Sequence, residues 1–417
     1  MERKNFAVLC AAVLCFWLFA LALGTAEGVG LRAVMHPEER AVSADVEEAA
    51  EGILLPAAAA APQLDLNCRA AILVEQGSGR VLYEKNADER REVASITKLM
   101  TALLVLEALD RDEIALTDSV QISPRAAAMK GSQALLDASA VYPLEDLLRT
   151  TIMASANDSA VALSEYIAGS EENFVDRMNR RAAELGMTNT NYVNCTGYPQ
   201  NGQYTTARDV CRLCCEIAKH PRYNQYASVW IDKLTHPGGR VTDLTNTNRL
   251  VRFYEGCDGY KTGSTDAAKY CLAATAEKNG MRLVAIVLGT PVSQTRFNEA
   301  RQMLDYGFAT YRRVVIANKG DLLGQNVEVR GGSAESVPLA LGSGLSMLLK
   351  NGQQSGLSLS VQLPESVDAP IAQGDVIGLV DVLLDGQVIA KLNCVAAEDV
   401  PRPGFIEGLL RILRNWR

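Results

Sequence analysis

Histidine is nearly absent from this sequence. Among the 417 residues only His36, His220 and His236 occur, and each of them precedes a proline. None of the three lies beside a motif that contains a nucleophile, so a Ser-His-Asp triad is not expected. Acyl-transfer chemistry in this chain would therefore need a base other than histidine.

Clusters of basic residues are also lacking. The formal net charge is −8, and no block of Lys and Arg interleaved with aromatic residues occurs. Because phosphate binding needs clustered positive charge, no nucleic-acid partner is expected. The hydrophobic content of 48% is enough for sizeable cores, and the length predicts two or three domains.

The cysteines show no regular spacing. Two of the ten lie in the N-terminal apolar run, and the other eight could in part form disulfides if the protein is exported. Cys211, Cys214 and Cys215 follow helical spacing, but no second Cys/His pair lies at ligand spacing from them. We expect them to be small core residues. No metal and no cofactor is predicted.

The N-terminus has the pattern of an export signal, assigned to residues 1–26. Arg3 and Lys4 precede the apolar run Phe6–Leu23, and small residues suited to cleavage follow. Cleavage is the favoured interpretation, and an uncleaved membrane anchor is the alternative. Either way the rest of the chain would lie outside the cytoplasm. Residues 27–62 are rich in Ala and Glu and are predicted to be a linker.

A first motif with reactive residue types lies in Val93–Glu107, where Ser95 and Lys98 precede a mostly apolar run with helical spacing. Residues three apart on a helix share a face, with roughly 5–6 Å between their Cβ atoms. One helical turn could thus provide a nucleophile, an amine and a backbone N–H for an oxyanion. Taken alone, S-x-x-K is more typical of a serine-capped helix with a surface lysine than of a catalytic pair.

Two further motifs follow in the chain. Ser155 and Asn157 form S-A-N just after a predicted helix, where a hydroxyl and an amide could line a cleft. Lys261, Thr262 and Gly263 form K-T-G on or entering a predicted strand. There the Lys ammonium and nearby hydroxyls could bind a carboxylate, and the glycine would let a ligand approach the backbone. Each motif alone is common in turns and strand edges.

Together, and in this order, the three motifs resemble the S-x-x-K, S-D-N and K-T-G set of penicillin-binding proteins and class A β-lactamases. The middle motif departs from that set, with Ala156 in its central position. Within the group, the chain is most similar to the low-molecular-mass penicillin-binding proteins, which are serine-type D-Ala-D-Ala carboxypeptidases. The similarity is carried by A-S-I-T-K-L-M-T, S-A-N-D-S-A-V-A-L, N-G-Q-Y-T-T-A-R-D and D-G-Y-K-T-G-S-T-D-A-A-K-Y.

The resemblance implies an α/β fold for residues 63–313, a penicillin-binding/β-lactamase-like domain with an antiparallel sheet flanked by helices. It implies that the substrate is the peptidoglycan stem peptide and that β-lactam antibiotics are inhibitors. The site residues it implies are Ser95 as nucleophile, Lys98 as base, Ser155 and Asn157 in the cleft, Lys261, Thr262 and Gly263 towards the substrate carboxylate, Ser264 as an oxyanion donor, and Arg296 near the carboxylate.

A lysine base must be neutral when it accepts a proton. We therefore hypothesise that burial and the charge of Lys261 lower the pKa of Lys98. A β-lactamase is an alternative function, but the E-x-x-L-N string of class A enzymes is absent between Asn157 and Lys261. A catalytically silent wall-binding protein is a second alternative.

The rest of the chain reads as short strands and Gly-rich turns, so residues 314–402 are predicted to form a small antiparallel, all-β domain. Residues 403–417 are predicted to form an amphipathic helix that binds a membrane surface, or else docks on the β domain. With the export signal, this places the protein on the outer face of the bacterial cytoplasmic membrane.

Overall fold

The computed structural model describes residues 64–404 and residue 406. The predicted signal and linker, and nearly all of the predicted C-terminal helix, lie outside these residues. Within the described part of the chain, no helix is long and apolar enough to cross a membrane. The chain divides between Arg313 and Val314 into two compact units.

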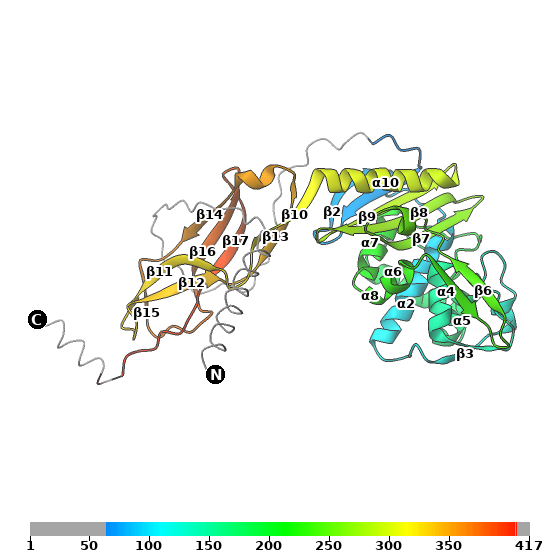
Figure 1. Ribbon diagram of the computed structural model, residues 1–417, viewed down its shortest axis with the longest axis horizontal. Helices are drawn as coiled ribbons and strands as arrows, with labels where there is room; N and C mark the ends of the chain where they lie inside the picture. The colour runs from blue at the N-terminus through cyan, green and yellow to red at the C-terminus, as the bar shows by residue number, and fades with distance from the viewer. Residues whose placement is uncertain (1–63, 405, 407–417) are drawn as a thin grey trace, which may run out of the picture. The chain divides into compact units, whose positions relative to one another are not determined.

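The first unit is built on a five-stranded antiparallel sheet (Figure 1). Its strand order is β2-β1-β9-β8-β7. The bounds are β1 (Ala70–Glu75), β2 (Arg80–Lys85), β7 (Cys257–Thr265), β8 (Lys269–Lys278) and β9 (Met281–Thr290). Helix α10 (Ser293–Thr310) covers one face of the sheet and α7 (Ala207–Ile217) the other (Figure 1). Because both faces are covered, β1 is buried along its whole length.

The helical part of this unit lies between β2 and β7 in the sequence. It comprises η1 (Ala94–Thr97), α2 (Lys98–Asp110), α3 (Pro124–Ala127), α4 (Leu144–Met153), α5 (Asn157–Ala168), α6 (Glu171–Glu184), α7, α8 (Pro221–Ala227) and α9 (Leu250–Phe253). Two small hairpins accompany the helices, β3 (Ser119–Gln121) with β4 (Val141–Pro143) and β5 (Ile231–Thr235) with β6 (Val241–Thr245).

Helix α2 is the central helix of this unit. Ten of its thirteen residues are buried, and it contacts α4, α5, α7 and β7. A helix that is apolar around its whole circumference must be surrounded by other elements. The helical spacing of the apolar run after Lys98 is confirmed, since Leu99, Leu103, Leu106 and Leu109 all lie on this helix and belong to the core.

The cysteines of helix α7 lie where the sequence predicted. Cys211 and Cys214 are part of the main hydrophobic core, and Cys215 packs against it half-buried. All eight cysteines in the described residues are free thiols.

The second unit is all β, as predicted. Its main sheet has the order β14-β16-β17-β12-β11-β15, and a further pair joins β10 to β13. The bounds are β10 (Tyr311–Ala317), β11 (Leu322–Arg330), β12 (Ser336–Leu341), β13 (Leu345–Lys350), β14 (Leu357–Gln362), β15 (Ser366–Asp368), β16 (Val376–Leu384) and β17 (Gln387–Ala396), with a short helix η2 (Gln353–Gly356).

One feature of this sheet corrects the prediction of a purely antiparallel domain. Strand β15 pairs with β11 in parallel. Strands β14 and β15 are the two edges of the sheet, yet only residues 363–365 connect them. Such a connection spans at most about 15 Å, whereas the edges of a flat six-stranded sheet are about 24 Å apart. The sheet must therefore curl so that its two edges approach each other. The chain then enters β15 running in the same direction as β11, which makes this pair parallel.

Candidate active site

Ser95 lies in the tight turn that precedes the central helix. The turn is the 3-10 helix η1, which passes directly into α2 at Lys98. Ala94, just before the serine, has a φ of 50°, in the left-handed region that non-glycine residues rarely adopt. Ser95 itself is half-buried, so its hydroxyl remains within reach of a ligand.

The amine of Lys98 is enclosed by three oxygen atoms. Its Nζ lies 3.1 Å from Ser95 Oγ, 2.6 Å from Asn157 Oδ1 and 2.7 Å from the backbone oxygen of Thr196. The residue is only 1% exposed. Burial lowers the pKa of Lys98 to about 7, because the charged form is deprived of water.

The S-A-N motif lies at the start of α5. Asn157 is the first residue of that helix, and its Nδ2 donates to the backbone oxygen of Lys130 at 2.5 Å. Ser155 is buried and has a left-handed φ of 62°, which turns the chain sharply before the helix. Asn157 thus connects the Lys98 amine to the segment that follows α3.

Asp158 is a buried neighbour of Asn157 that the three motifs did not indicate. Its fully buried carboxylate accepts from the backbone N–H groups of Ala134 and Leu136, at 2.9 and 3.1 Å. A buried carboxylate needs such partners, and here they fix the segment that forms one wall beside Asn157. In the sequence, Asp158 is marked only by its position after S-A-N. Because acidic residues are common in the first turn of a helix, that position alone does not indicate a buried carboxylate.

The K-T-G motif lies on β7, against the turn that contains Ser95. A Cβ added to Gly263 would lie 2.3 Å from the backbone oxygen of Val93 and 3.2 Å from Ile96 N, so only glycine allows this approach. Thr262 Oγ1 donates to Thr247 Oγ1 at 2.7 Å. Ser264, at the exposed end of the motif, is open to solvent.

Lys261 is buried in the same region. Its Nζ donates to the backbone oxygen of Thr262 at 3.2 Å. Burial lowers the pKa of Lys261 well below its ordinary value, and the charges of Lys98 and Arg296 lower it further. The hypothesis of charge repulsion thus needs a correction. Burial is what lowers the pKa of Lys98, and the repulsion acts on the pKa of Lys261.

Arg296 is not an exposed helix residue. It extends from α10 to the K-T-G strand, where Nη1 donates to the backbone oxygens of Gly263 and Cys271 at 3.1 and 3.3 Å. Its Nε is buried without a hydrogen-bond partner. Burial lowers the pKa of Arg296 to about 10, and the side chain lies beside the rings of Tyr270 and Phe297.

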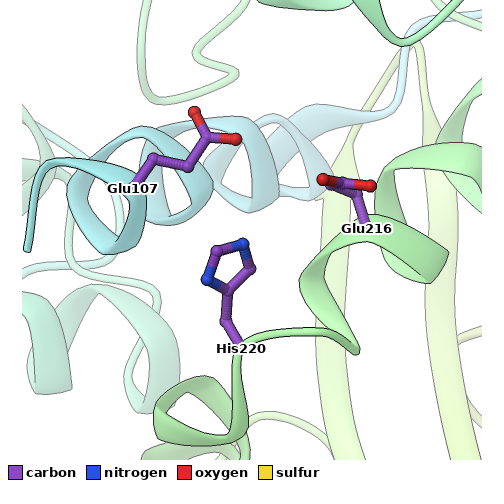
Figure 2. Close-up of side chains that lie close together, drawn as sticks. All are labelled: Glu107, Glu216 and His220. Carbon is purple, nitrogen blue, oxygen red and sulfur yellow. The ribbon is translucent and has the colours of Figure 1, made fainter. Parts of the chain in front are cut away.

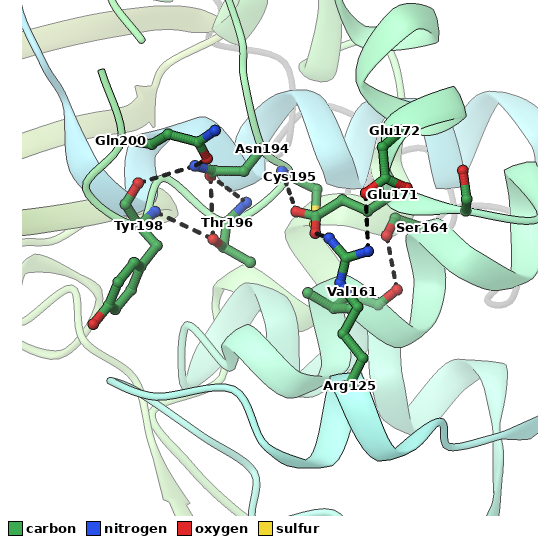
Figure 3. Close-up of polar contacts among 12 residues, drawn as sticks. Arg125, Val161, Ser164, Glu171, Glu172, Asn194, Cys195, Thr196, Tyr198 and Gln200 are labelled. Carbon is green, nitrogen blue, oxygen red and sulfur yellow. Dashed lines mark hydrogen bonds and ion pairs between the residues drawn. The ribbon is translucent and has the colours of Figure 1, made fainter. Parts of the chain in front are cut away.

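The loop Asn194–Tyr198 provides the Thr196 oxygen that contacts Lys98. Figure 3 shows the hydrogen bonds within this loop. Asn194 Oδ1 accepts from the N–H groups of Thr196 and Gly197 at 3.2 and 2.7 Å, and its Nδ2 donates to the Tyr198 oxygen. Gly197 has a φ of 77°, and a Cβ there would lie 1.9 Å from the Ala94 oxygen. The sequence motifs do not reveal the Thr196 acceptor, because it is a backbone oxygen and any residue type could provide it.

A separate cluster lies away from this site, at the far end of α2 (Figure 2). The side chains of Glu107, Glu216 and His220 face one another, with ligand atoms within 4.8 Å. Arg181 already pairs with both carboxylates, at 2.8 and 3.2 Å, and His220 Nδ1 contacts Asp110 at 2.7 Å. Lys219 also pairs with Glu216, so the two carboxylates already have cationic partners and the cluster forms an ion-pair network that joins α2, α6 and α7.

The three motifs predicted from the sequence therefore converge. Lys98 contacts Ser95 and Asn157 directly, and the strand that contains Lys261 packs on η1, the turn that contains Ser95. An antiparallel sheet, a serine at the start of a buried helix and a buried lysine partner define a penicillin-binding serine acyltransferase.

Comparison with known proteins narrows this class to one family. The sequence model of the D-alanyl-D-alanine carboxypeptidases matches residues 56–292, and that of the C-terminal domain of penicillin-binding protein 5 matches residues 311–402. D-alanyl-D-alanine carboxypeptidase DacF of Bacillus subtilis is 36% identical over 355 residues, which cover 85% of this chain and 91% of the relative. DacC of Escherichia coli is 35% identical, over 83% of this chain and 86% of its own.

Solved structures agree. Penicillin-binding protein 5 of Haemophilus influenzae superposes with a TM-score of 0.67 at 31% identity, covering 82% of this chain and 99% of that one. The chain belongs to the serine-type D-alanyl-D-alanine carboxypeptidases, the low-molecular-mass penicillin-binding proteins. The resemblance and the fold predicted from the sequence are thereby confirmed.

Proposed function

We propose that this protein removes the terminal D-alanine from peptidoglycan stem pentapeptides through an acyl-enzyme on Ser95, with Lys98 as the base. The family supports the reaction, and the surroundings of the Lys98 amine support the assignment of residues.

The observation that carries this assignment is the hydrogen bonding of Lys98. Two of its three partners, Asn157 Oδ1 and the Thr196 backbone oxygen, are carbonyl oxygens, which can only accept. A neutral amine has two N–H groups and one lone pair. Once the two carbonyl oxygens take the N–H groups, the lone pair is left to face the hydroxyl hydrogen of Ser95. The geometry thus holds the amine in the orientation that a base requires.

The acylation step follows from this arrangement. Lys98 takes the proton of the Ser95 hydroxyl as Oγ attacks the carbonyl carbon of the penultimate D-alanine. The backbone N–H groups of Ser95 and Ser264 stabilise the negative charge on the carbonyl oxygen. When the peptide bond breaks, the proton passes to the amine of the departing D-alanine, with the Ser155 hydroxyl as relay. Water then attacks the ester and releases the shortened peptide.

Substrate recognition is assigned to the K-T-G strand. Lys261 and Thr262 bind the terminal carboxylate of the substrate, and Gly263 allows close approach of the strand. Arg296 adds positive charge from α10 to the K-T-G strand, and its hydrogen bond holds the Gly263 carbonyl in place. The same carboxylate-binding group would receive the carboxylate of a β-lactam, which acylates Ser95 in the same manner.

Loss of one alanine from a muramyl pentapeptide, measured by mass spectrometry, tests the proposal. The full chain is expected to convert pentapeptide to tetrapeptide, and Ser95→Ala is expected to be inactive while folded. A penicillin should label Ser95 stoichiometrically and be released slowly. Rapid penicillin turnover without peptide cleavage would point to a β-lactamase, and no reaction with either compound to a silent wall-binding protein.

The location of the enzyme is part of the proposal. The signal pattern of residues 1–26 supports export, and the apolar face of residues 403–417 supports binding to the membrane surface. Removal of residues 403–417 is expected to release the protein from anionic lipid vesicles in a sedimentation assay. Equal sedimentation of the full and truncated chains would contradict the role of this helix.

A further inference from the structure

Glu171 is a buried acid close to the proposed site that no step of the mechanism uses. It is the first residue of α6, and it is only 7% exposed. A carboxylate at a helix start normally stays in water and interacts with the helix dipole. Burying one is costly unless both of its oxygens find strong partners.

The partners of Glu171 connect it to the loop around Lys98 (Figure 3). Oε1 accepts from the backbone N–H of Cys195 at 3.0 Å, and Oε2 pairs with Arg125 of α3 at 2.6 Å. The carboxylate therefore bridges a charged side chain and a backbone group that belong to two separate segments.

The same peptide segment is held again on its other side. Thr101 Oγ1 donates to the Cys195 backbone oxygen at 2.6 Å, and Lys98 Nζ donates to the next backbone oxygen, that of Thr196. Lys98 and Thr101 are three apart on α2 and share a face of the helix. Glu171 is thus the partner that fixes this segment from the side opposite to α2.

We propose, given the function proposed above, that Glu171 is a positioning residue for acylation, which holds the Cys195 peptide and thereby places the Thr196 oxygen against the Lys98 amine. The residue does not touch the substrate. It acts by keeping one of the two carbonyl acceptors in place, so that the lone pair of the amine stays directed at Ser95.

Loss of this support has two expected effects. The base is misplaced, and errors of about 1 Å in such positions cost up to about a hundredfold in rate. The loosened loop also admits water to Lys98, and since burial is what lowers its pKa, that pKa rises. The charged or titratable groups near the amine are Asp158 of α5, Cys195 of the loop and Lys261 of β7. Burial and then the charge of Glu171 raise the pKa of the Cys195 thiol, so loss of Glu171 removes part of that rise.

Glu172 offers a matched control. It follows Glu171 directly and pairs with the same Arg125, at 2.9 Å, but its side chain is 69% exposed. A Glu172→Ala variant therefore removes a charge next to the same arginine and leaves the Cys195 contact intact. A Glu171→Gln variant removes the charge but keeps an amide oxygen that can accept from Cys195 N–H.

The experiment measures acylation of the full chain by a fluorescent penicillin between pH 5.5 and 9.5. Glu171→Ala is expected to be acylated about tenfold more slowly than wild type at pH 8. The pH range over which its rate increases should also lie higher than in wild type, because the pKa of Lys98 is raised. Glu171→Gln should recover most of the rate, and Glu172→Ala should match wild type. Where Glu171→Ala gives no folded protein by thermal unfolding, Glu171→Asp replaces it, because its shorter side chain no longer reaches Cys195.

The inference is overturned if Glu171→Ala keeps the wild-type rate and pH profile, or if Glu171→Gln loses as much as Glu171→Ala. It is also overturned if Glu172→Ala falls equally, since the effect would then come from charge beside Arg125. Failure of the wild-type chain to be acylated at all would instead count against the proposed function.

Discussion

The rate of acylation is expected to depend on pH through Lys98. Burial lowers the pKa of this amine from 10.5 to about 7. At pH 7 about half of the enzyme would then carry the neutral base, whereas an unshifted lysine would be neutral in only about one molecule in 3000. The environment of Lys98 thus raises the reactive fraction roughly 1500-fold at neutral pH.

The assay follows the second-order rate of acylation by a chromogenic or fluorescent β-lactam from pH 5.5 to 10.5. Below pH 7 the rate should rise about tenfold per pH unit, because a single proton must leave Lys98, and above pH 8 it should level off. The carboxylate of the β-lactam stays ionised throughout this range, so the rise in rate below pH 7 must come from a group of the enzyme.

A matched variant tests whether the pH dependence comes from Lys98 or from a histidine. His236 is the described histidine with a shifted pKa, and burial lowers that pKa below 6.5. His236→Gln should therefore keep the rise in rate near pH 7. A rate that continues to climb towards pH 10, or that does not change with pH, would refute a neutral, buried lysine base.

Three further outcomes are expected. Asn157→Ala removes the amide oxygen that accepts from Lys98, and acylation should fall about 10- to 100-fold, the equivalent of a lost hydrogen bond to a charged or reacting group; an unchanged rate would remove the residue from the site. Gly197→Ala places a methyl group against the backbone carbonyl of Ala94, beside Ser95, so the unfolding temperature and the extent of penicillin labelling should both fall. Gly202→Ala is the control: its φ is similar but its nearest contact is at 3.7 Å, so it should lower stability only modestly. Thr262→Val removes a hydroxyl assigned to carboxylate binding and should raise KM for pentapeptide more than it lowers kcat; a pure loss of kcat would contradict this role.

Much of this site could be predicted because its chemistry is carried by side chains in short motifs. Ser95 and Lys98 are three apart on a helix, and the structure brings them within hydrogen-bonding distance. The K-T-G strand was predicted from its apolar, glycine-containing context, and β7 contains it. The all-β nature of the second unit followed from its short strands and Gly-rich turns.

What could not be predicted depends on contacts between distant segments. The Thr196 acceptor is a backbone atom, and no residue type marks it. Glu171 has the sequence context of an ordinary acidic helix start, and only the position of the Cys195 loop makes it a buried partner. The parallel pairing of β15 likewise arises from the curl of a whole sheet, which local periodicity does not encode.

The pairing of β1 with β9 has a consequence for how the enzyme comes into being. Ala70 at the start of β1 lies opposite Leu288 near the end of β9, so the first strand of the sheet pairs with a strand that is synthesised much later. Until β9 arrives, β1 is paired with β2 along one edge only, and its other edge is left open to pairing with another chain. The strand with Lys261 also joins late, through β8 to β9. An unfinished chain therefore contains Ser95 and Lys98 but not yet the K-T-G strand, so the candidate site is assembled only when the whole sheet is complete.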